Sequence, residues 1–158
     1  MALRLTPIYS AEVPTALYNR DILRLAASIP HLGRLDQPQA SVERRSPVCG
    51  SRVTVDLSLD REGRVAALGQ EVKACALGQA AAALLGSHAE GRTRGELAEA
   101  RDSLAAYLRG ERDDPGAWPG LAIFADARRF PARHASILLA FDAAAEAAAL
   151  AGAESARP

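Results

Sequence analysis

The segment VTVDLSLDREGRVAALGQEVK, residues 53–73, has the pattern of two neighbouring β-strands joined by a turn. Its first half alternates apolar and polar residues, the pattern of a strand with one dry face and one wet face. Residues 60–63 predict a turn with glycine where a positive φ is useful, and residues 65–73 predict the returning strand. A link this short predicts an antiparallel hairpin. The dry face consists of Val53, Val55, Leu57 and Leu59, and the wet face of Thr54, Asp56 and Ser58.

Outward from the hairpin, the chain predicts one more strand and several helices. A short polar strand is expected near residues 40–45, and helical spacing of apolar residues predicts a first helix over residues 15–28. After the hairpin, residues 74–87 and 136–150 predict helices. A further helix starts at the capping box of Thr93 and Glu96 and ends at Gly110. The sequence therefore predicts an α+β fold, a three-stranded antiparallel sheet with helices covering one face.

Length and composition are those of one domain with its own core. The chain has 158 residues, of which 49% are hydrophobic. We expect a flexible N-terminus over residues 1–13, a single domain over residues 14–151 and a disordered tail over residues 152–158. There is no run of about 18 apolar residues and no signal-peptide pattern, so we expect no membrane helix and a cytoplasmic location.

Charge and cysteine content narrow the function classes. Nineteen Lys and Arg balance nineteen Asp and Glu, which argues against nucleic acid as the main partner. Cys49 and Cys75 are the two cysteines. In a reducing compartment a structural disulfide is not expected, so each thiol is either buried or used chemically.

Each cysteine lies next to a strand end, where it could take part in a site. Cys49 precedes the alternating strand and is followed by Gly50, which allows close backbone approach. Cys75 lies where a strand gives way to a helix, and the partial positive charge of a helix N-terminus favours the metal-binding thiolate. Two such cysteines on one sheet edge could meet. The alternative is that both are small buried apolar residues.

Two residues near the start of the last predicted helix, His134 and Ser136, could have a role in a site or in the helix start. His134 could serve as a neutral imidazole ligand, although a lone histidine there is more often a packing or surface residue. Ser136 is expected to be the N-cap of the helix.

Four segments taken in order resemble the U-type iron–sulfur cluster scaffold family, whose members include the IscU, SufU and NifU N-terminal types. The resemblance covers roughly residues 14–148, and it implies a SufE/NifU-like α+β fold. The four segments are LYNRDILRLAASIPHLGRLDQP (17–38), SPVCGSRVTVDLSLDREGRVAAL (46–68), VKACALGQAAAALL (72–85) and FPARHASILLAFDAAAEAA (130–148).

The resemblance implies a metal site made by three cysteines and an aspartate, with a histidine in some branches. Cys49 and Cys75 match the first two cysteines, Ser51 stands at the aspartate position and Ser136 at the third cysteine position. His134 lies one residue before the histidine position of the IscU branch. The implied ligand set is thus reduced, because serine binds soft or borderline metals poorly unless it is deprotonated.

The resemblance implies participation in iron–sulfur cluster assembly, as a scaffold or carrier that is not an enzyme. Iron, a [2Fe–2S] cluster or zinc would be held by Cys49 and Cys75, with His134, Ser136 and Ser51 as further candidates. A cysteine desulfurase and apo-protein acceptors would be the partners, without nucleic acid or membrane, and a homodimer is left open. Two alternatives remain: a sulfur-transfer protein that accepts persulfide on Cys75, and a binding module that has lost the cluster chemistry and binds no metal.

Overall fold

The structure, a computed structural model, describes residues 19–47 and 50–155. The predictions for residues 1–18 and for the last three residues lie outside this part of the chain. In chain order the elements are α3 (Arg20–Ala26), β1 (Ala40–Arg45), β2 (Arg52–Leu59), β3 (Val65–Lys73), α4 (Ala76–His88), α5 (Arg94–Leu108), the 3-10 helices η1 (Leu121–Arg129) and η2 (Pro131–Arg133), and α6 (His134–Ser155).

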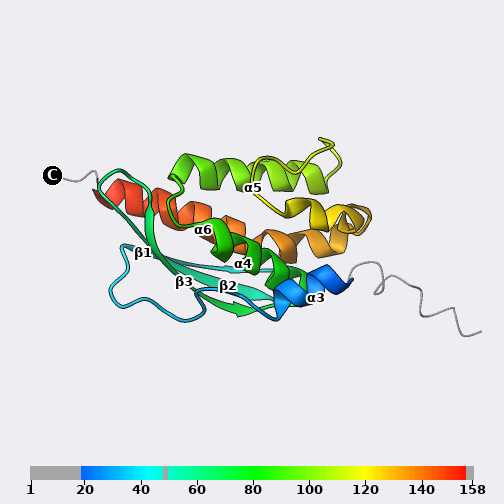
Figure 1. The fold of residues 1–158 in the computed structure, drawn as a ribbon, viewed down its shortest axis with the longest axis horizontal. Helices are drawn as coiled ribbons and strands as arrows, with labels where there is room; N and C mark the ends of the chain where they lie inside the picture. Colours follow the sequence, from blue (N-terminus) through cyan, green and yellow to red (C-terminus); the bar gives the residue numbers. More distant parts are fainter. Residues whose placement is uncertain (1–18, 48–49, 156–158) are drawn as a thin grey trace, which may run out of the picture.

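The predicted sheet and its helical cover are confirmed. The three strands form an antiparallel sheet in the order β1-β2-β3, and Gly63 in the β2–β3 turn has the expected positive φ of 79°. Figure 1 shows α4 and α6 lying on one face of the sheet, with α5 beyond them. The α5 helix starts at the predicted capping box of Thr93 and Glu96. The α+β prediction is therefore correct.

Small side chains let α4 and α6 lie close to each other and to the sheet. Both helices bury many alanines, and the inner face of β2 contributes fully buried Val53, Val55 and Leu57. Trp118 is also buried in this core, and its ring packs edge-on against Phe141 with ring centroids 5.4 Å apart. This aromatic pair adds apolar contact area that the small alanine side chains lack.

The last helix is longer than the sequence indicated. We expected a helix over residues 136–150 and disorder from residue 152, whereas α6 runs from His134 to Ser155, so the helix includes residues 152–155. The segment Pro131–Ala153 is also long and apolar enough, by length and composition alone, to pass as a membrane span, which the search for an unbroken apolar run missed. It is mostly buried inside the fold, where an apolar helix serves as the centre of the core.

Asp56 was expected on the wet face of the hairpin, but it is fully buried. The loop after α3 lies over it, and its carboxylate accepts hydrogen bonds from the Arg34 Nε at 2.7 Å, the Leu35 N–H at 2.9 Å and the Ser41 hydroxyl at 2.6 Å. Every donor comes from outside β2, so a single carboxylate ties the loop and β1 to the central strand. This satisfies the rule that a buried charge must be paired and hydrogen-bonded.

The same loop also runs along the edge of β3. The Gln70 N–H donates to the His31 carbonyl at 2.9 Å, and the Gly33 N–H donates to the Gln70 carbonyl at 2.8 Å. The contact is so close that a Cβ on Gly69 would lie 2.5 Å from the Gly33 carbonyl oxygen. Glycine at position 69 is therefore required by the crossing loop.

We expect Asp56→Asn to lower the free energy of unfolding at neutral pH by about 1–3 kcal/mol, because buried donors lose their charged acceptor. Burial by itself would raise the pKa of Asp56, but the hydrogen bonds and the Arg34 charge outweigh it and hold the pKa below its ordinary 3.8. The stabilisation is thus present above pH 3.8 and disappears as the pH falls through the lower folded-state value. Urea unfolding from neutral pH down to about pH 3 tests this; a difference between the two proteins that does not shrink in acid would contradict it.

Candidate functional site

Cys75 lies at the junction of β3 and α4. It is the N-cap residue of α4, with an extended backbone, and its carbonyl accepts the first helical hydrogen bond from the Gln79 N–H at 2.9 Å. Its side chain makes no capping hydrogen bond. The thiol is therefore free to face the neighbouring helix.

Three side chains from distant parts of the sequence meet at this junction. The Cys75 Sγ lies 3.2 Å from the Ser136 Oγ, and the Ser136 hydroxyl lies 3.3 Å from the Ser51 Oγ. Ser51 precedes β2, Cys75 precedes α4 and Ser136 belongs to the first turn of α6. Both serines are buried, whereas Cys75 is half-buried. The fold thus gathers three of the five site residues predicted from the sequence.

Ser136 does not cap a helix, which corrects the sequence prediction. The α6 helix begins two residues earlier, directly after η2, so Ser136 lies inside it. Its side chain is 2% exposed, and its hydroxyl bridges the Cys75 thiol and Ser51. The serine therefore belongs to the candidate site.

A glycine on α4 makes this meeting possible. A Cβ on Gly78 would lie 2.8 Å from the Ser136 Oγ and 2.7 Å from the Ala74 Cβ, distances that real Cβ atoms do not tolerate. Because Gly78 lies one helical turn after Cys75, the missing side chain lets α6 approach α4 beside the thiol. The sequence predictions gave Gly78 no role; a lone glycine inside an apolar helical run is the signal that could have indicated a close helix contact.

The loop between β1 and β2 carries the first cysteine and Ser51. Cys49 lies outside the described residues, so its predicted place in the site stays a prediction. The loop is closed by a hydrogen bond from the Ser46 N–H to the Ser51 carbonyl at 2.9 Å. Gly50 has a φ of 74°, and a Cβ at this position would meet no atom within 4 Å. Glycine therefore suits the left-handed backbone of the turn, and the expected close approach to whatever the Cys49 thiol meets stays a prediction.

His134 is held away from the other three residues. Its Nε2 lies 2.9 Å from the Ala127 carbonyl oxygen, and because a carbonyl only accepts, the ring nitrogen donates. Two residues along a helix correspond to roughly 200° of rotation, so His134 and Ser136 do not share a face of α6. The ring is therefore oriented by η1, and the structure does not bring it to the thiol.

The donors that the described residues bring together could contact a metal ion, but by themselves they are fewer than the four ligands of a usual metal site. Two donors on one tetrahedral metal ion lie roughly 3.3–3.8 Å apart, given bonds of about 2.0–2.3 Å. The distances of 3.2 and 3.3 Å along the Cys75–Ser136–Ser51 chain are close to this, and they are also hydrogen-bond distances. Within residues 19–47 and 50–155, no three His, Cys, Asp or Glu side chains gather in a way that could hold a metal.

Comparison with known proteins assigns the family. No protein-family model and no curated protein matches the chain. Among solved structures, the N-terminal part of a NifU-like protein from Brucella abortus shares 37% sequence identity, with a TM-score of 0.82 over 88% of this chain and 96% of that one. This chain belongs to the NifU-like family.

Two more distant structures share the fold of this NifU-like chain. A protein of Fervidobacterium islandicum AW-1, described as a putative iron–sulfur cluster assembly scaffold of the SUF system, is 20% identical, with a TM-score of 0.79 over 86% of this chain and 98% of that one. A protein described as hypothetical is also 20% identical, with a TM-score of 0.73 over 92% of this chain and 99% of that one. The predicted U-type resemblance and the NifU-like fold are therefore correct.

We expect Gly78→Ala to destabilise this NifU-like protein by about 1–3 kcal/mol, because the added methyl group forces α4 and α6 apart at Ser136. The matched control is Gly95→Ala in the first turn of α5, where a Cβ would meet only the Thr93 Oγ1 at 3.8 Å. The control should be neutral or slightly stabilising, since alanine is the better helix former. Urea unfolding of both variants checks this, and equal effects would contradict the close contact.

Proposed function

We propose that this NifU-like protein acts in iron–sulfur cluster assembly as a scaffold or carrier, with iron, a [2Fe–2S] cluster or zinc as its cargo. The observation that carries the proposal is the convergence of the Cys75 thiol with the Ser136 and Ser51 hydroxyls, since these positions match the ligand positions of the family. Membership of the NifU-like family supports the same role. A scaffold holds its cargo without turning over a substrate, so no catalytic residue is proposed.

In this proposal the two thiols are the principal ligands. Cys75 acts as a thiolate, and Cys49, in the loop closed by the Ser46–Ser51 hydrogen bond, supplies the second sulfur. The Ser136 hydroxyl, 3.2 Å from the Cys75 sulfur, is positioned to enter the same coordination shell or to donate a hydrogen bond to the thiolate. His134 could become a further ligand only after its hydrogen bond to the Ala127 carbonyl breaks.

The cargo is expected to bind weakly, because this chain offers few strong ligands. Clusters with thiolate ligation normally have four protein ligands. At two of the four family positions this chain offers a serine hydroxyl, which is a weak donor for iron or zinc unless it is deprotonated. We therefore propose weak, transient loading, with a cysteine desulfurase as the sulfur donor and apo-proteins as acceptors, in the cytoplasm.

We expect anaerobic incubation with ferrous iron, cysteine, a cysteine desulfurase and excess thiol reductant, which reduces the persulfide sulfur to sulfide, to load the wild-type protein at low occupancy, and Cys75→Ala to abolish the loading. The double variant Ser51→Asp/Ser136→Cys restores the two anionic donors and should retain about tenfold more iron and sulfide after gel filtration. Visible absorbance together with iron and sulfide quantification gives the measurement.

Ser103→Cys is the matched control for this experiment. Ser103 is a buried serine of α5 that bonds Arg112 at 2.9 Å, so a cysteine there adds a third thiol away from the site. Its loading should equal that of the wild type. If the wild type and the double variant both stay colourless and free of metal while their thiols are fully reduced, cluster assembly is the wrong function.

A further inference from the structure

Three basic side chains form one row across the face of the sheet that the helices leave open. In the strand register, Arg45 of β1 pairs with Arg52 of β2, and Arg52 pairs with Lys73 of β3. Side chains alternate between the faces of a strand, and the next residue, Val53, is fully buried under the helices. The row Arg45–Arg52–Lys73 therefore lies on the opposite, open face, which we call the basic row.

Most of the positive charge in this row is not neutralised within the fold. Like charges directly opposite each other on neighbouring strands are destabilising. Arg45 has a counter-ion, since its Nε lies 2.5 Å from the Glu43 carboxylate. The side chains of Arg52 and Lys73 make no hydrogen bond or ion pair with any residue in the described ranges. Arg52 and Lys73 are therefore available to pair with acidic groups of a partner.

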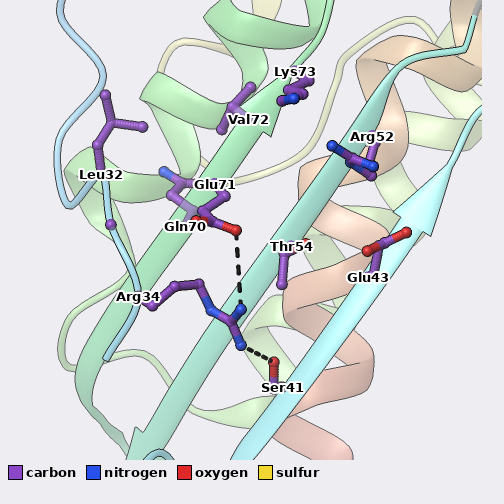
Figure 2. Close-up of a pocket in the computed structure, with 11 residues that line it drawn as sticks. Leu32, Arg34, Ser41, Glu43, Arg52, Thr54, Gln70, Glu71, Val72 and Lys73 are labelled. Atoms are coloured by element: carbon purple, nitrogen blue, oxygen red, sulfur yellow. Dashed lines mark hydrogen bonds and ion pairs between the residues drawn. The ribbon is translucent and has the colours of Figure 1, made fainter. Parts of the chain in front are cut away.

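The rest of the open face is paired internally. Figure 2 shows Arg34 reaching across the sheet, where it bonds Ser41 at 3.1 Å and lies 3.9 Å from the Glu71 carboxylate. It also pairs with the buried Asp56 at 2.7 Å. The unpaired positive charge is thus concentrated at the Arg52–Lys73 end of the sheet, although the chain as a whole has a formal net charge of zero.

The basic row borders the candidate site directly. Arg52 follows Ser51 in the chain, and Lys73 precedes Cys75 by two residues. Both side chains line a groove of about 740 Å³ on the open face. At the rim of this groove stands Leu32, a large apolar side chain that is 60% exposed. A partner seated at the Arg52–Lys73 end of the groove would contact the chain segments that lead into Ser51 and Cys75.

We propose that the basic row docks a carboxylate-rich surface of the protein that donates sulfur to this site. The inference rests on the proposed function, which requires such a donor. It adds the location of the donor's binding surface, at the basic row. Complementary charges steer encounter and fix the register of an interface. An acidic patch opposite Arg52 and Lys73 would relieve their repulsion and hold the donor at the edge of the Cys75 site.

The test measures binding of a cysteine desulfurase by calorimetry at about 50 and about 200 mM NaCl. We expect Arg52→Glu and Lys73→Glu each to weaken binding about tenfold at low salt, and wild-type binding to weaken as salt rises. The matched control is Arg61→Glu, the same charge change at an exposed turn residue between β2 and β3, at the other end of the hairpin. It should change binding less than about twofold.

Two further readouts separate docking from other effects. The melting temperature of Arg52→Glu should be unchanged or raised, because the substitution removes a repulsion within the row. Cys75→Ala should still bind the desulfurase, so docking and metal loading can fail independently. If the wild type takes up no iron or sulfide but Arg52→Glu and Lys73→Glu still weaken desulfurase binding, only the proposed function is wrong. If the wild type takes up iron and sulfide but neither substitution changes desulfurase binding, only the docking site is wrong.

Three results would overturn the docking site outright. The first is an absence of measurable desulfurase binding to the wild type. The second is an equal loss of binding in Arg61→Glu. The third is binding of a labelled single-stranded oligonucleotide with the same affinity and the same dependence on Arg52 and Lys73, which would indicate a general polyanion surface.

Discussion

The close contact of α4 with α6 is the constraint on which the site depends. Gly78 has no side chain to keep the helices apart, so the first turn of α6 reaches the N-terminus of α4 and Ser136 comes to lie 3.2 Å from Cys75. The alanines buried along both helices continue this contact through the core. Tight packing of small residues transmits any added volume, because protein interiors have few voids to absorb it. The position of the thiol is thus a consequence of core packing.

A second constraint fixes the sheet beneath that core. The buried Asp56 carboxylate takes hydrogen bonds from the loop after α3 and from β1, which ties these two segments to the central strand. This arrangement also divides the charges of the open sheet face. Arg34 is drawn to Asp56 and Glu71, whereas Arg52 and Lys73 are left without counter-ions in the described chain. The hydrogen-bonded Asp56 and the basic row therefore lie at two ends of the same sheet face.

The chemistry of the site follows from which donors occupy the family's positions. Ser51, Ser136 and Cys75 form a chain of hydrogen-bonded side chains. The NifU-like resemblance implies a carboxylate at the position of Ser51 and thiolates at the positions of Ser136 and Cys75. Neutral hydroxyls can form a hydrogen bond with a thiol, although a weak one, and they are poor ligands for iron or zinc. The same geometry can therefore serve as a resting network without metal and as a weak site with metal. Both states fit the proposed role of a carrier that binds its cargo weakly.

The α+β class, the strand bounds 65–73 and the capping box at Thr93 could be predicted from the amino-acid sequence, because they depend on local alternation and local hydrogen bonds. The sequence also placed Ser51, Cys75 and Ser136 together, through the family resemblance. The burial of Asp56, the bridging role of Ser136 and the hydrogen bond of His134 to Ala127 could not be predicted in this way and are seen in the folded chain. Each of these depends on a segment distant in the chain, and periodicity carries no information about which distant groups will meet.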